Sequence, residues 1–150
     1  MKTMRTKYIF SSIFIVSSIL SFTLSGCSNS TGCFDEYEDN NAIVIVPAIG
    51  CSGCINTTLQ YLREHYKSKR LKFVVTRYRN DKELRLTIGK KLYNSPNRIK
   101  QNDAPNDCEW LYKDHPVIFY NGKKDTPDVI MPANARSLLD KLDSFLENNK

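Results

Sequence analysis

The feature that most constrains the fold is the cysteine pair of Cys51-Ser52-Gly53-Cys54, which lies between two different periodic patterns. The β-branched run 42–46 before it is typical of a buried strand, and the apolar residues after it recur at the three- and four-residue spacing of a helix face. The free N–H groups and partial positive charge of a helix N-terminus favour a thiolate on the first cysteine. The pattern therefore predicts a disulfide that can close and reopen at a strand-to-helix junction.

The first half of the chain predicts a βαβ unit followed by a second helix. The first helix is expected to end near Lys67, and a strand is expected at 71–78. Strand, helix and strand in this order indicate a right-handed crossover between parallel strands. Asn80 is expected to cap the second helix, with Glu83 as its capping-box partner. The polar stretch 94–107 is expected to be a loop.

The second half predicts an antiparallel pair of strands and a final helix. A short helical turn at 107–112 precedes a strand at 116–120, and the following Asn121-Gly122 is a strong hairpin signal that leads to a fourth strand around 128–131. Residues 135–148 have the spacing of an amphipathic helix. The expected fold is α/β, with a central mixed four-stranded sheet flanked by helices.

The N-terminus has the layout of a secretory signal, with basic residues, an apolar run and then Leu24-Ser25-Gly26-Cys27. These last residues resemble the bacterial lipobox, which implies cleavage after residue 26 and a lipid on Cys27. An ordinary signal peptide with a chance cysteine and an uncleaved membrane anchor are the alternatives. We favour the lipoprotein because the apolar run is short and rich in serine. Residues 27–41 would then be a flexible tether, and residues 42–150 an extracytoplasmic domain on the bacterial cell envelope.

Charge and histidine spacing bear on the partners. The formal net charge is +6, but the basic residues are scattered and no recognition motif accompanies them, so we expect no nucleic-acid partner. The two histidines, His65 and His115, are isolated in sequence. Two thiolates from Cys51 and Cys54 are too few for a closed zinc site unless a partner supplies ligands. We therefore expect no metal and no other cofactor.

The order of elements over residues 42–147 resembles the thioredoxin-like fold family, in which C-x-x-C stands beside a βαβ unit. His115-Pro116, at the start of the third predicted strand, looks like that family's cis-proline segment. The resemblance implies a thiol–disulfide oxidoreductase in which Cys51 attacks a substrate disulfide and Cys54 resolves the mixed disulfide. It also implies that His115 and Pro116 contact an extended substrate. The implied partners are disulfides or dithiols of exported proteins and an upstream redox partner.

The chain departs from thioredoxins proper around the cysteines. Those proteins have Trp before the first cysteine and Gly-Pro between the two, where this chain has Gly50 and Ser52-Gly53. They also carry a buried acid on the preceding strand, where Ile45 or a neighbour stands here. These differences leave the direction of exchange open. The imidazole of His115 could compensate by facing the sulfurs and stabilising a thiolate, or its ring could point to solvent.

Two cysteines remain, Cys33 and Cys108. We favour a disulfide between them that pins the N-terminal arm to the domain, whereas a third redox thiol at Cys108 or two free thiols are the alternatives. A second interpretation of the whole chain also stays open. In it, the protein is a redox-inactive lipoprotein that binds proteins or peptides, and the Cys51–Cys54 disulfide is structural.

Overall fold

The computed structural model describes residues 34, 37, 41–104, 108–121 and 127–148. All of them belong to the compact unit Thr31–Lys150. The predicted signal segment, Cys27 and Cys33 lie outside the described residues. Within the described part of the chain, no helix combines the length and the apolar character that a membrane span requires.

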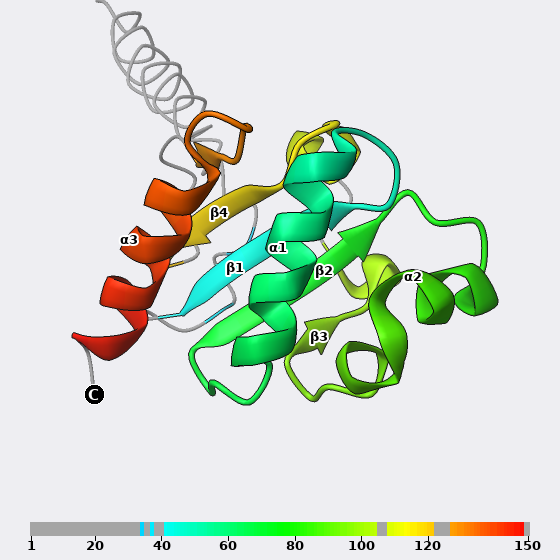
Figure 1. Ribbon diagram of the computed structural model, residues 1–150. Helices are drawn as coiled ribbons and strands as arrows, with labels where there is room; N and C mark the ends of the chain where they lie inside the picture. Colours follow the sequence, from blue (N-terminus) through cyan, green and yellow to red (C-terminus); the bar gives the residue numbers. More distant parts are fainter. Residues whose placement is uncertain (1–33, 35–36, 38–40, 105–107, 122–126, 149–150) are drawn as a thin grey trace, which may run out of the picture. The chain divides into compact units, whose positions relative to one another are not determined.

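A five-stranded mixed sheet forms the centre of this unit (Figure 1). Its strands, in the spatial order β3-β2-β1-β4-β5, are β1 (Ala42–Pro47), β2 (Leu71–Thr76), β3 (Arg98–Ile99), β4 (Val117–Tyr120) and β5 (Asp128–Val129). β1 pairs in parallel with β2 and antiparallel with β4, and β4 pairs antiparallel with β5. The α/β class, the βαβ unit and the antiparallel pair are therefore confirmed.

The predicted number of four strands is wrong, because the stretch 94–107 contains a fifth. Arg98 and Ile99 pair in parallel with Phe73 and Val74 of β2. Ile99 is buried against the sheet, and the Phe73 amide donates a hydrogen bond to the Asn97 carbonyl oxygen (3.0 Å). A strand of two residues is too short to produce a periodic signal in the sequence.

Three α-helices pack against one face of the sheet. They are α1 (Ser52–His65), α2 (Asp81–Tyr93) and α3 (Ala135–Glu147). Figure 1 shows α1 lying across β1 and β2, with α3 and α2 on either side. Each helix contributes apolar side chains to one core cluster with Val44, Phe73 and Ile118 of the sheet. Helices flank the sheet as expected, but all three cover the same face.

Short segments cover the opposite face. Two 3-10 helices, η1 (Gln101–Asp103) and η2 (Glu109–Tyr112), adjoin β3 and β4, and η2 confirms the predicted helical turn. Phe34 is fully buried here, with its ring centroid 5.7 Å from that of Phe119. Phe34 lies in the stretch predicted as a tether, so that residue is part of the core. Burial of such a side chain contributes about 1.5–3 kcal/mol of stability.

Cys108 is buried in the same cluster and is disulfide-bonded. The interpretation of Cys108 as a free thiol is therefore wrong. Cys33 lies outside the described residues, so the Cys33–Cys108 disulfide stays a prediction.

Three local details differ from expectation. β2 ends at Thr76, two residues earlier than predicted, because Arg77 adopts the left-handed region (φ 62°), which breaks the extended backbone. Asn80 caps α2 as predicted, its side-chain oxygen accepting a hydrogen bond from the Glu83 amide (2.9 Å). The Glu83 carboxylate accepts instead from the Arg79 amide (2.9 Å), one residue before the cap. Gly89 (φ 81°) places a kink in α2.

Candidate redox site

Cys51 and Cys54 form a disulfide at the N-terminus of α1, with their Cα atoms 5.4 Å apart. Cys51 is the N-cap residue, and Cys54 lies within the first turn. Cys51 is partly exposed, whereas Cys54 is 1% exposed and belongs to the core cluster under the three helices. The first turn of α1 contains no acidic residue, so no carboxylate there opposes negative charge on sulfur.

The segment before β4 holds this start of α1 in place. Ile45 of β1 lies opposite Val117 of β4 in an antiparallel register, so the residues before β4 run beside those after β1. The Cys51 amide donates a hydrogen bond to the Asp114 carbonyl oxygen (3.0 Å). Gly50 has a φ of 154°, and a Cβ on it would lie only 2.8 Å from the Asp114 carbonyl carbon and would overlap the carbonyl oxygen. A glycine is therefore required where the two segments meet.

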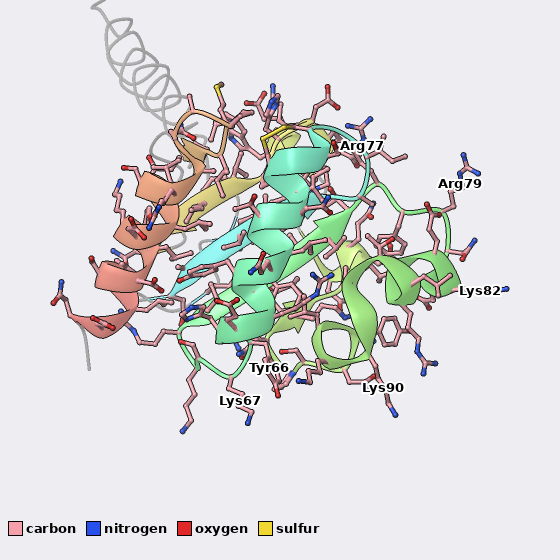
Figure 2. The ribbon with its side chains drawn as sticks, viewed as in Figure 1. Tyr66, Lys67, Arg77, Arg79, Lys82 and Lys90 are labelled. Carbon is pink, nitrogen blue, oxygen red and sulfur yellow. A yellow bond between two sulfur atoms is a disulfide. The ribbon has the colours of Figure 1, made fainter. Side chains whose placement is uncertain are left out.

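Arg77 joins a third segment to this junction. It follows β2, at the same end of the sheet as the start of α1, and is labelled in Figure 2. Its guanidinium Nη1 donates to Asp114 Oδ1 in an ion pair, and its amide donates to Gln101 Oε1 (3.2 Å). The Asp114 side chain is 68% exposed, so solvent screens the ion pair. We infer that its main effect is on the position of the Asp114 segment.

The ring of His115 faces the disulfide. A ring nitrogen of His115 and the Sγ atoms of Cys51 and Cys54 all lie within 4.8 Å of one another. His115 is partly buried, so its imidazole is not fully exposed to solvent. Among the described residues, these three side chains form the one cluster with the donor atoms for a metal ion. His115 therefore lies beside the sulfurs as predicted, and its role in stabilising a thiolate stays a prediction.

Pro116 differs from its predicted conformation. No peptide bond between described residues is cis, so the His115–Pro116 bond is trans and the prediction of a cis-proline is wrong. A prolyl bond favours trans by only about 0.5–1 kcal/mol, so the order of residues does not determine the isomer. The Pro116 carbonyl oxygen accepts a hydrogen bond from the Ile130 amide (2.8 Å), which extends the pairing of β4 with β5.

Reasoning from the sequence brought Cys51, Cys54 and His115 together correctly but missed Arg77, Asp114 and Gln101. These three residues lie in different segments, and no local pattern in the sequence pairs them. β1 supplies no acid to the site, because its six residues are Ala42-Ile43-Val44-Ile45-Val46-Pro47. Among the described residues, His115 is an ionisable side chain that lies close to both sulfurs.

No protein-family model matches this chain, and no curated protein and no solved structure is significantly similar to it.

Proposed function

We propose that this protein is a thiol–disulfide oxidoreductase with a thioredoxin-like fold, and that Cys51–Cys54 is its redox-active pair. The observation that carries the proposal is the disulfide at the N-terminus of α1, in which the Cys51 residue is partly exposed and the Cys54 residue is buried. A nucleophilic cysteine must be accessible to its substrate, and a helix N-terminus favours its thiolate form. A structural disulfide requires neither feature.

The difference in exposure assigns the two roles. Cys51 is partly exposed, so its thiolate attacks a substrate disulfide, forms a mixed disulfide and releases one substrate thiolate. The Cys54 thiolate then attacks Cys51 Sγ, closes the Cys51–Cys54 disulfide and releases the second substrate thiolate. The substrate gains two electrons, takes up two protons from solvent and becomes a dithiol. Substrate oxidation is the same sequence in reverse.

His115 tunes the pair in this mechanism. A protonated imidazole within 4.8 Å of both sulfurs stabilises the Cys51 thiolate and so favours the reduced state. The Asp114 carbonyl oxygen holds the Cys51 amide, which fixes the direction of the first turn of α1. Because the Pro116 carbonyl oxygen already accepts a hydrogen bond from Ile130, we place the backbone contact with substrate at His115.

The order β1-α1-β2, then β4 and β5 and a final α3, supports the thioredoxin-like assignment. The trans peptide bond before Pro116 and the placement of three helices on one face depart from the expected pattern. The Leu24-Ser25-Gly26-Cys27 sequence supports a lipid anchor at Cys27 on the extracytoplasmic face of a bacterial envelope. There the substrates are exported proteins, and an upstream redox partner regenerates the pair.

Trapping of the mixed disulfide tests the nucleophile. Without Cys54 the adduct cannot be resolved, so the Cys54→Ser variant should accumulate a covalent complex with a disulfide-bonded peptide, attached at Cys51. The Cys51→Ser variant should form no such complex, and both variants should lose insulin reduction driven by a small dithiol. His65→Ala is the matched control, because His65 lies at the other end of α1. Equal insulin reduction by Cys51→Ser and the parent would contradict the assignment.

A structural role for the disulfide is the second candidate, because Cys54 packs in the core and the bond closes the first turn of α1. In that case the chain is a redox-inactive lipoprotein that binds proteins or peptides. Selective reduction of the pair, which closes a loop of only four residues, would then lower the free energy of unfolding by about 2 kcal/mol, and Cys54→Ser would trap no adduct. A trapped adduct at Cys51 would exclude this role.

A further inference from the structure

We propose that the reduced site binds one thiophilic d10 metal ion, Zn²⁺ or Cu⁺, through Cys51 Sγ, Cys54 Sγ and a ring nitrogen of His115. The inference rests on the part of the proposed function in which the pair can be reduced. It does not require exchange with a protein substrate. His115 supplies the third ligand that the two cysteines lack.

The spacing of the donor atoms fits a single ion. A tetrahedral zinc ion with ordinary Zn–S and Zn–N bonds holds two sulfurs about 3.8 Å apart, and a sulfur and a nitrogen about 3.6 Å apart. All three donor atoms of this site already lie within 4.8 Å of one another. Once the disulfide opens, small side-chain rotations suffice to bring them onto one ion. They come from two segments that the Cys51–Asp114 hydrogen bond holds together.

The chemistry of the donors selects the class of ion. Thiolates are soft ligands that favour Zn²⁺ or Cu⁺ over Mg²⁺ or Ca²⁺, and imidazole suits both of the former. The nearest carboxylate in sequence, that of Asp114, is engaged by the Arg77 guanidinium. Cys51 and His115 are partly exposed, so a water molecule can complete a four-coordinate zinc site, while Cu⁺ is satisfied by the three protein ligands.

Metal binding and the disulfide exclude each other. A small dithiol reductant supplies two electrons and two protons to Cys51–Cys54 and is itself oxidised to a disulfide. The ion then displaces the two thiol protons to solvent and keeps its oxidation state. Its coordination occupies the Cys51 sulfur, so the bound ion prevents attack on a substrate disulfide.

The test titrates the full chain with each ion under anaerobic conditions, after reduction has released two thiols per chain. Zn²⁺ and Cu⁺ are titrated separately, each in competition with a chromophoric chelator. The double variant Cys51→Ser/Cys54→Ser defines binding elsewhere on the chain. His115→Ala removes the third ligand, and His65→Ala is the matched control, about 16 Å along α1 from Cys54. Each variant is checked for native secondary structure before reduction.

We expect the parent chain to bind one more equivalent of Zn²⁺ or Cu⁺ than the double variant does. His115→Ala should bind this ion at least tenfold more weakly, and His65→Ala should bind it with the affinity of the parent. Absence of this equivalent for both ions would overturn the proposal, as would equal affinity in His115→Ala and the parent. Mixed-disulfide trapping without metal separates the two proposals. If the chain traps substrate but binds no ion, the metal proposal is wrong and the proposed redox function stands. If it binds the ion but traps no substrate, the redox function is wrong and the metal site stands.

Discussion

Replacement of Gly50 by alanine tests the packing on which the site depends. Gly50 has a φ of 154°, and a Cβ there would overlap the carbonyl group of Asp114. The two segments must then move apart, which breaks the hydrogen bond from the Cys51 amide to the Asp114 oxygen. The lost hydrogen bond costs about 1 kcal/mol, and an alanine in this backbone region adds about 1–3 kcal/mol of strain.

We therefore expect Gly50→Ala to lower the free energy of unfolding by about 2–4 kcal/mol and the Tm by roughly 10 °C. Gly53→Ala is the matched control. A Cβ on Gly53 meets no atom within 4 Å, and alanine favours the helix by about 0.5–1 kcal/mol, so this variant should be slightly more stable than the parent.

Urea unfolding of the oxidised chains, followed by far-UV circular dichroism, measures both changes. The m-value should stay constant while the midpoint shifts. Because the start of α1 moves, Gly50→Ala should also reduce insulin more slowly at temperatures where it is folded. A stability within about 0.5 kcal/mol of the parent would refute the reasoning, since it would mean that the two segments do not touch.

Three further predictions concern side chains around the site and core. His115→Ala should lower the reduction potential of Cys51–Cys54 by about 20 mV, because a cation that stabilises the thiolate is lost; an unchanged potential in glutathione buffers would exclude the role of His115. Burial and a hydrogen bond to Asp143 (2.6 Å) raise the pKa of Tyr61 in the folded chain. As the pH rises, the Tyr61 hydroxyl therefore ionises first in the unfolded chain, so its contribution to the free energy of unfolding is complete below about pH 10 and is lost above it. In urea unfolding at several alkaline pH values, the free energy of unfolding should fall less steeply with pH for Tyr61→Phe than for the parent. An equal slope in the two chains would contradict this role of Tyr61. Cys108→Ser should cost about 2–4 kcal/mol in urea unfolding, and peptide mapping of the parent should place the partner at Cys33; alkylation of Cys108 in the unreduced folded chain would contradict this.

The parts of the fold that follow from local patterns were predictable. The run 42–46 and the helical spacing after Cys54 gave the first strand and helix, and their order implied the parallel crossover that places the dithiol at the end of the sheet. The cap at Asn80 was predictable for the same reason, because its hydrogen bond spans three residues.

The parts that depend on contacts distant in sequence were not predictable. β3 has two residues and owes its existence to pairing with β2. The trans bond before Pro116 differs from its alternative by a small free energy that the surrounding chain decides. Arg77 and Asp114 are separated by 37 residues, and their ion pair exists because β2 and β4 both flank β1. The positions of Cys51 and Cys54 at the start of α1 could be predicted from local sequence patterns. The contact between Arg77 and Asp114 could not, because it depends on the order of strands in the sheet.

The reduction potential of the Cys51–Cys54 pair is the most direct test of the redox function. It is measured by equilibrating the full chain in buffers of defined thiol–disulfide ratio and counting alkylated Cys51 and Cys54 by mass, with Cys108 as the internal reference for a buried disulfide. A redox-active pair at the N-terminus of α1 predicts a potential above about −300 mV, within the range of known exchange catalysts. A potential below about −300 mV, where structural disulfides resist reduction, would contradict the proposed function.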